Sequence, residues 1–232
     1  MNYEIVSIPE RRVVGIGTRA QNNAGCTEKI GKLWADFMCP GGACEKLEYP
    51  SEDAPCYGVY TNYNYEEMSY DVFAACDSKN CPVGFTELVI PAGKYAKFSF
   101  HGDVRASTAA AWDEVWKTTL PRAFAVDFEE YATCDDNMQG DINIYIGLAD
   151  ICQSCGMPMT KSTDYGTEKG GSKSTAYCCY CRTNGTFAQD CTMDEMIDFC
   201  LNCEEGQKLY SDREIARKQM QDYFPTLLRW KK

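Results

Sequence analysis

Four cysteines in the C-terminal third of the chain have the spacing of a metal site. They form two Cys-x-x-Cys pairs, Cys152/Cys155 and Cys178/Cys181, separated by 22 residues rich in Gly, Ser and Thr. Each pair can direct two thiolates at one point, and together they supply the four tetrahedral ligands of a structural Zn²⁺. A metal would stabilise a segment that is too short and polar to bury a large core. Disulfide pairing, or burial of plain thiols, is the alternative.

Three later cysteines leave another ligand set open. Cys200 and Cys203 are three residues apart on a predicted helix, and with Cys191 they form a candidate second site or an alternative set of ligands. Residues three apart share one face of a helix, so core packing explains the same pattern. The earlier cysteines show no tight pairing and are expected to be buried residues or free thiols: Cys26, Cys39, Cys44, Cys56, Cys76, Cys81 and Cys134.

The second candidate site is a carboxylate on a predicted strand, VDFEEYA. Side chains alternate across a strand, so Glu129 and Tyr131 share one face while Phe128 and Glu130 share the other. A glutamate on an inward face beside an aromatic ring would be a buried carboxylate, which takes up a proton or awaits a cationic or hydrogen-bonding ligand. The alternative is a pair of solvated glutamates on an exposed face.

The composition is that of a folded protein with one large domain or two small ones. The chain has 232 residues, of which 44% are apolar and 12% aromatic. No run of 18 apolar residues is present, so no membrane-spanning helix is expected. The first 20 residues have a strand-like pattern and not that of a signal peptide. Fifteen cysteines without an export signal favour reduced thiols in the cytoplasm.

The net negative charge of the chain comes from its first two-thirds. Residues 1–150 contain 12 Lys and Arg against 23 Asp and Glu, whereas residues 151–232 contain 11 of each group. Neutralising nucleic-acid phosphates needs a basic surplus, so direct DNA binding is not expected. An acidic domain favours a cationic or neutral small ligand.

Residues 1–150 contain the same order of elements twice: strand, helix, strand, strand. Amphipathic helices are predicted over 27–39 and 105–120. Thr27 is placed to cap the first helix, and Ser107 or Thr108 the second. Two such βαββ units predict an α+β domain in which the helices lie on one side of each antiparallel sheet. A ligand cleft is expected between the two halves.

Residues 151–232 are predicted to form a second, smaller domain, a four-cysteine ribbon followed by two helices. The helices are predicted over 192–203 and 211–224. Thr192 with Glu195, and Ser211 with Glu214, have the spacing of a capping box.

Residues 1–150 resemble a GyrI-like effector-binding domain, the module that also forms the drug-sensing half of AraC-type and MerR-type transcription activators. The matching segments are IVSIPERRVVGIGTRA, YGVYTNY, IPAGKYAKFSFHGD and VWKTTLPRAFAVDFEEY, the last with a Phe-Glu-x-Tyr pattern. The resemblance implies that Glu129 lies at the centre of a ligand cleft, with Tyr131 beside it and Trp116 nearby. It also implies aromatic walls, for which the candidates are Tyr60, Trp34, Tyr95 and Phe98.

The function implied is recognition of a small organic molecule, neutral or cationic, by a transcription-regulator-type sensor or a sequestering protein. No basic helix pair of the DNA-reading type flanks the domain, so a regulatory role would act through another protein. Some members of the superfamily hydrolyse small electrophiles. A second hypothesis is therefore a hydrolase in which Glu129 and a tyrosine activate water.

Residues 151–232 resemble a zinc-ribbon domain found as an appendage in bacterial proteins. The matching segments are CQSCGMPM, YGTEKGGSKSTAYCCYC and the tail FPTLLRWKK. The resemblance implies that the two Cys-x-x-Cys pairs are the zinc ligands, and it leaves the role of the ribbon open. A third hypothesis is a protein-interaction adaptor that works through the ribbon and its basic, aromatic tail.

Overall fold

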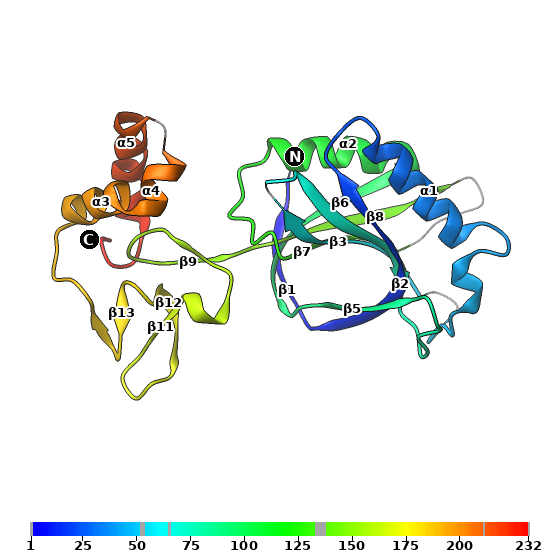
Figure 1. Cartoon of the computed structure of the whole chain (residues 1–232), viewed down its shortest axis with the longest axis horizontal. Helices are drawn as coiled ribbons and strands as arrows, with labels where there is room; N and C mark the ends of the chain where they lie inside the picture. The colour runs from blue at the N-terminus through cyan, green and yellow to red at the C-terminus, as the bar shows by residue number, and fades with distance from the viewer. Residues whose placement is uncertain (1, 52–53, 65, 133–137, 211, 232) are drawn as a thin grey trace. The chain divides into compact units, whose positions relative to one another are not determined.

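The structure, a computed structural model, describes residues 2–51, 54–64, 66–132, 138–210 and 212–231 (Figure 1). The chain divides into two compact units, Met1–Leu148 and Ala149–Lys232, and each is described by itself. Among the described residues, no helix is long and apolar enough to cross a membrane.

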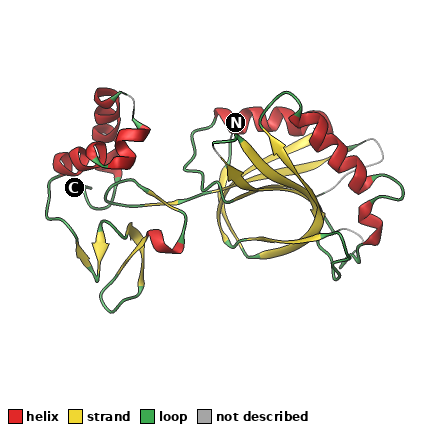
Figure 2. Cartoon of the chain, viewed as in Figure 1, coloured by secondary structure: helices red, strands yellow, loops and turns green. Residues whose placement is uncertain are grey.

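One eight-stranded antiparallel sheet forms the framework of the first unit (Figure 2). Its strand order is β1-β6-β8-β7-β3-β4-β2-β5. Two α-helices and a short 3₁₀ helix accompany the sheet. The elements are β1 (Glu4–Ile8), β2 (Arg11–Gln21), α1 (Cys26–Met38), η1 (Ala43–Lys46), β3 (Cys56–Asn64), β4 (Ser69–Cys76), β5 (Thr86–Ile90), β6 (Gly93–Asp103), α2 (Val104–Lys117), β7 (Val126–Tyr131) and β8 (Gln139–Gly147).

The two predicted βαββ units are present as β2-α1-β3-β4 and β6-α2-β7-β8. They share one sheet and do not form the two separate sheets predicted, because β3 of the first unit pairs with β7 of the second. Each half also contributes an edge strand to the other. Strand β1 pairs with β6 of the second unit, and β5 pairs with β2 of the first. The repeats meet where β3 pairs with β7, and there Gly58 lies directly opposite Glu129.

Both helices pack on the same face of the sheet. Leu33 and Phe37 of α1 pack in one cluster with residues of β2, β3 and β4, and Ala111 and Val115 of α2 pack against β6 and β8. The opposite face holds its own core, in which the rings of Phe128 and Tyr145 stack with centroids 4.4 Å apart. Alternation along β7 places Glu129 and Tyr131 on one face, as predicted, and the structure shows that this is the face that carries the helices.

The predicted caps of the first two helices are wrong. Helix α1 begins at Cys26 with Gly25 as its N-cap and no side-chain cap, so Thr27 lies inside the first turn. Helix α2 begins immediately where β6 ends. Asp103 Oδ1 accepts a hydrogen bond from the Ala106 backbone at 2.7 Å, which places Ser107 and Thr108 inside the helix. An aspartate at the end of the strand supplies the acceptor that the first turn needs.

The second unit consists of short hairpins followed by helices. The predicted capping box of Thr192 and Glu195 is confirmed. Asp212 caps the last α-helix, and the predicted cap Ser211 lies outside the described residues. The elements are β9 (Asp150–Ile151), β10 (Pro158–Met159), η2 (Ser162–Asp164), β11 (Tyr165–Thr167), β12 (Lys173–Cys178), β13 (Arg182–Thr183), β14 (Thr186–Phe187), α3 (Met193–Asn202), α4 (Glu204–Leu209), α5 (Arg213–Tyr223) and η3 (Phe224–Thr226).

Candidate functional site

A cavity of about 1680 Å³ opens on the helix face of the first unit, between α1, α2 and the central strands. Its lining is predominantly aromatic and apolar. The only acids among the described lining residues are Asp113 and Glu129, and no Lys, Arg or His is among them. The aromatic lining residues are Trp34, Tyr60, Tyr63, Tyr70, Trp112, Trp116, Phe124 and Tyr131.

Glu129 is a buried acidic residue in the lining of this cavity, with 1% of its surface exposed. Its Oε1 accepts hydrogen bonds from the Tyr60 hydroxyl at 2.7 Å and from Trp112 Nε1, and its Oε2 accepts one from the Tyr131 hydroxyl at 2.7 Å. Burial raises the pKa of Glu129, and the hydrogen bonds from Trp112, Tyr131 and Tyr60 oppose that shift. All three donors are neutral, so they hold the carboxylate without neutralising it.

Both tyrosines stay in the donor form at neutral pH. Burial and the negative charge of Glu129 raise the pKa of Tyr60 and of Tyr131 well above the ordinary value. A phenol that cannot ionise keeps its proton directed at the carboxylate. Tyr60 and Tyr131 therefore act as fixed hydrogen-bond donors and not as general bases.

Gly58 makes room for this arrangement from the neighbouring strand. A Cβ on Gly58 would lie 2.4 Å from Glu129 Oε2 and 3.3 Å from Cζ2 of Trp34. The missing side chain lets the carboxylate and the Trp34 ring lie over β3. Trp34 then meets Tyr131 edge to face, with ring centroids 5.1 Å apart.

A second buried carboxylate, Asp127, lies two residues before Glu129 and is already neutralised. It accepts from Arg122 Nη2 at 2.5 Å, from the Tyr63 hydroxyl at 2.7 Å and from the Gly147 backbone at 2.8 Å. The Arg122 guanidinium lies 4.4 Å from the ring centroid of Trp116 and 4.6 Å from that of Phe124. The charge of Asp127 is balanced by Arg122, whereas the described hydrogen-bond partners of Glu129 are all neutral. The negative charge of Glu129 is therefore left without a balancing cation among the described residues.

Five of the seven residues predicted for the ligand site line the cavity: Glu129, Tyr131, Trp116, Tyr60 and Trp34. Tyr95 and Phe98 do not. Tyr95 belongs to the core of the opposite face, where its ring centroid is 5.5 Å from that of Phe128. Phe98 is on the helix face but is fully buried beneath α2. Both belong to β6, whose helix-facing side is covered by α2.

Sequence analysis missed Trp112 as a partner of the carboxylate. Trp112 and Trp116 are four residues apart on α2 and fall on one side of the helix, so their spacing alone does not distinguish their roles. The structure separates them, because Trp112 reaches Glu129 while Trp116 is 58% exposed. Tyr63, Tyr70 and Phe124 were also missed, since only the tertiary fold brings them to the cavity.

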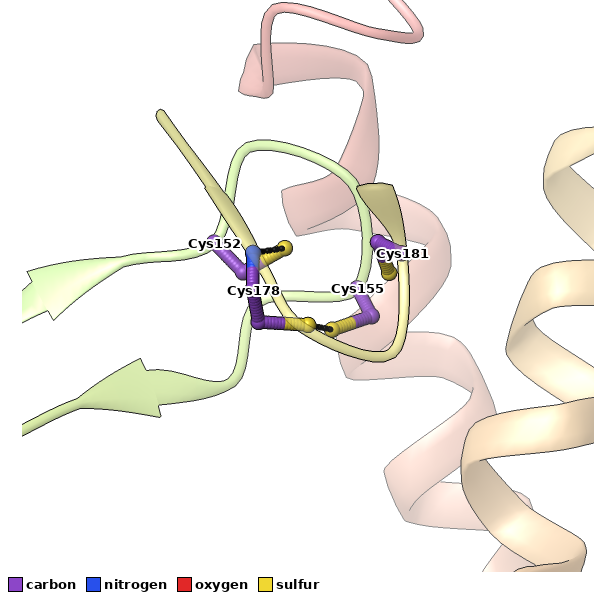
Figure 3. A group of neighbouring side chains, drawn as sticks. All are labelled: Cys152, Cys155, Cys178 and Cys181. Carbon is purple, nitrogen blue, oxygen red and sulfur yellow. Dashed lines mark hydrogen bonds between the residues drawn. The ribbon is translucent and has the colours of Figure 1, made fainter. Parts of the chain in front are cut away.

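The second unit brings the four predicted metal ligands together (Figure 3). The sulfurs of Cys152, Cys155, Cys178 and Cys181 all lie within 4.8 Å of one another, and three of the four residues are buried. Cys155 Sγ and Cys178 Sγ are 3.7 Å apart, and the Cys178 backbone donates to Cys152 Sγ at 3.3 Å. Ligand sulfurs about 2.3 Å from a tetrahedral ion lie about 3.8 Å from each other, so the four thiols fit such an ion.

The chemistry of this group also favours a cation. No disulfide joins any of the four residues in the structure. Four buried thiolates cannot coexist without a positive charge, which a divalent ion supplies. The geometry therefore supports the metal site and not the disulfide alternative.

The candidate second cysteine set does not form a comparable group within the part of the chain that the structure describes. Cys203 caps α4, accepting from the Gly206 backbone at 3.3 Å. Cys200 Sγ contacts the Cys155 carbonyl at 3.8 Å, and Cys191 Sγ accepts from Arg229 at 3.5 Å. These thiols support the ribbon through packing and capping.

A duplicated βαββ sheet with a large aromatic cavity on its helix face is the architecture of an effector-binding domain. Residues 4–148 match the sequence family described as "Integron-associated effector binding protein", and the match covers more than half of the chain. The chain therefore belongs to this family, and the resemblance to GyrI-like domains is confirmed. Residues 151–231 match the family described as "Putative zinc ribbon domain".

Two solved structures share the fold of the first unit. An integron cassette protein from the mobile metagenome of Vibrio cholerae is 28% identical, with a TM-score of 0.53 over 62% of this chain and 94% of its own. SAV2435, solved bound to tetraphenylphosphonium, is 17% identical, with a TM-score of 0.52 over 63% of this chain and 93% of its own. No curated protein matches the chain.

The close approach at Gly58 predicts the effect of adding one methyl group there. In Gly58→Ala, the new Cβ must displace the Glu129 carboxylate, and such overpacking costs about 1–3 kcal/mol of unfolding free energy. Urea unfolding followed by tryptophan fluorescence measures the loss. Gly31→Ala is the matched control and should not lose stability. A Cβ at Gly31 of α1 has no atom within 4 Å, and alanine favours a helix more than glycine does. Equal stability of the two variants would contradict the crowding at Gly58.

Proposed function

We propose that the first unit binds a bulky, aromatic organic cation in its cavity, with Glu129 as the buried counter-charge. The observation that carries this proposal is the isolation of that carboxylate: it is buried, it has three neutral donors, and no basic residue is among the described lining. A desolvated anion without a cation is costly, and a cationic ligand removes that cost on binding.

The rings around the carboxylate favour the same class of ligand. Aromatic faces attract cations, and the attraction is strongest where water is excluded. Tyr60 and Trp112 meet edge to face with centroids 5.1 Å apart, so rings surround Glu129 on the floor of the cavity. A volume of about 1680 Å³ accommodates a ligand with several ring systems.

The biological role we propose is that of a sensor or a sequestering protein. A sensor would pass its signal to another protein, because the acidic first unit lacks the surplus of positive charge that DNA contacts need. The hydrolase hypothesis is less well supported, since both oxygens of Glu129 already accept hydrogen bonds and would have to be freed to act on water.

For the second unit we propose one structural Zn²⁺ held by Cys152, Cys155, Cys178 and Cys181. A set of four thiolates is the usual environment of structural zinc, and hard ions such as Mg²⁺ prefer oxygen ligands. Cys152 and Cys178 belong to the buried core of the unit together with helix residues such as Ile197 and Leu201. The metal would therefore link the ribbon to the helices.

A pair of probes with the same shape and opposite charge tests the cation site. We expect tetraphenylphosphonium to bind and tetraphenylborate not to bind, with titration calorimetry as the measurement. Glu129→Gln should weaken cation binding about 10- to 100-fold, because it removes the buried negative charge that attracts the cation. Glu130→Gln, on the opposite face of the same strand, is the matched control and should bind as the unmodified protein does. Binding of both ions with similar affinity would overturn the proposal.

The raised pKa of Glu129 predicts a dependence on pH. Above that pKa the carboxylate is ionised and cation affinity is constant, whereas below it a proton competes and affinity falls about tenfold per pH unit. In the ligand-free protein, the stability of the native state changes with pH in the opposite direction. Protonation of Glu129 stabilises the native state below the unfolded pKa of about 4.3, and this contribution is lost as pH rises through the folded value. Titrations from pH 4 to pH 8 should show the slope, and Glu129→Gln should abolish it.

Elemental analysis tests the metal assignment. We expect about one zinc per chain, lost in Cys178→Ser together with the fold of the second unit, because removing a ligand removes most of the metal's folding energy. Cys179→Ser is the matched control, since Cys179 is adjacent to a ligand but outside the four-sulfur group. Undiminished zinc in Cys178→Ser would point instead to Cys191, Cys200 and Cys203.

A further inference from the structure

The end of the chain folds back onto the first cysteine turn of the ribbon. Trp230 Nε1 donates to the Ser154 carbonyl at 2.6 Å, and the Arg229 backbone donates to the Gln153 carbonyl at 3.1 Å. The Leu228 backbone donates to the Gln153 side chain at 3.3 Å. Gln153 and Ser154 are the two residues between the ligands Cys152 and Cys155, so these bonds fall inside the metal turn itself.

The Arg229 side chain extends this contact to a distant part of the ribbon. Its Nη1 donates to Ser154 Oγ at 3.0 Å, and its Nη2 donates to the Gln189 carbonyl at 2.6 Å. The guanidinium lies 4.1 Å from the ring centroid of Phe187 and 4.5 Å from that of Trp230. Arg229 thus connects the first cysteine turn to the segment that follows the second one.

These contacts involve groups that are costly to leave unpaired. Ser154 is fully buried, so its carbonyl and hydroxyl need hydrogen-bond partners within the protein. Trp230 and Arg229 of the tail supply them. Phe224 and Leu227, which precede Arg229 in the chain, are buried in the core of the unit. They fix the position from which the tail runs to the cysteine turn. A divalent ion with four thiolates also carries a net charge of −2, and Arg229 brings a positive charge to the neighbourhood of the ligands.

We propose that Arg229 and Trp230 are positioning residues of the metal centre: they fix the direction in which Cys152 and Cys155 present their sulfurs, and they slow the release of the ion. The proposal rests on the zinc assignment made above. Outer residues that orient ligands typically change metal affinity about 10- to 100-fold when they are altered.

The experiment measures zinc transfer from the full-length, zinc-loaded protein to the chromogenic chelator 4-(2-pyridylazo)resorcinol. Trp230→Phe keeps the ring and removes the N–H donor, and Arg229→Gln removes the charge. We expect each variant to release zinc about 10- to 100-fold faster than the unmodified protein. Lys231→Gln is the matched control, because Lys231 is exposed and adjacent to Trp230, and it should release zinc at the unmodified rate.

Two further measurements separate positioning from a general loss of structure. The Co²⁺-substituted variants should keep their helical circular dichroism while the tetrahedral ligand-field bands shift or weaken. In a Ser154→Ala background, Arg229→Gln should add less to the release rate than it does alone, because its main partner in the turn is gone. If Arg229→Gln does not fold, Arg229→Lys is measured in its place. Lysine keeps the positive charge but lacks the two separate guanidinium donors that reach Ser154 and Gln189.

The outcomes distinguish this proposal from the zinc assignment. Absence of zinc from the unmodified protein would contradict the assignment itself. Zinc present and released at the same rate from Trp230→Phe, Arg229→Gln and the unmodified protein would leave the assignment intact and overturn the positioning role.

Discussion

The Glu129 carboxylate is the charge around which the first unit is organised. A buried carboxylate is tolerated when donors satisfy its oxygens, and here an indole and two phenols do so without cancelling its charge. The three donors come from α2, β3 and β7, so one group ties together a helix and the two central strands. The same contacts that stabilise this polar site also leave the cavity negatively charged.

The position of that group follows from how the two repeats join. Strands β3 and β7 are the corresponding strands of the two halves and pair with each other at the centre of the sheet. The junction places a glycine opposite the glutamate, so one repeat contributes the charge and the other contributes the space. A duplicated fold is thus asymmetric at the cavity.

Local patterns predicted more than long-range ones did. The alternation of VDFEEYA assigned Glu129 and Tyr131 to one face, and the Cys-x-x-Cys spacing identified a group of four sulfurs that the fold brings together. The exchange of β1 and β5 between the halves could not be predicted, because pairing of distant strands leaves no periodic trace in the sequence. Tyr95 was misplaced for a different reason: Tyr95 and Phe98 are three residues apart on β6, so alternation places them on opposite faces and they could not both line one cavity. The distinct roles of Trp112 and Trp116 depend on where α2 lies over the sheet.

The arginine between two rings has a consequence for the walls of the cavity. Arg122 lies against Trp116 and Phe124 with Asp127 at its edge, so the protein fills one aromatic cage with a cation of its own. The face of the Trp116 ring that the Arg122 guanidinium covers is not free to hold a second cation. Among the described residues, no Lys or Arg lies over the rings of Trp34 and Trp112, the two indoles nearest to Glu129. In the cation site that we propose, the rings beside Glu129 would therefore face the positive centre of the ligand, and Trp116 would contribute apolar contact area.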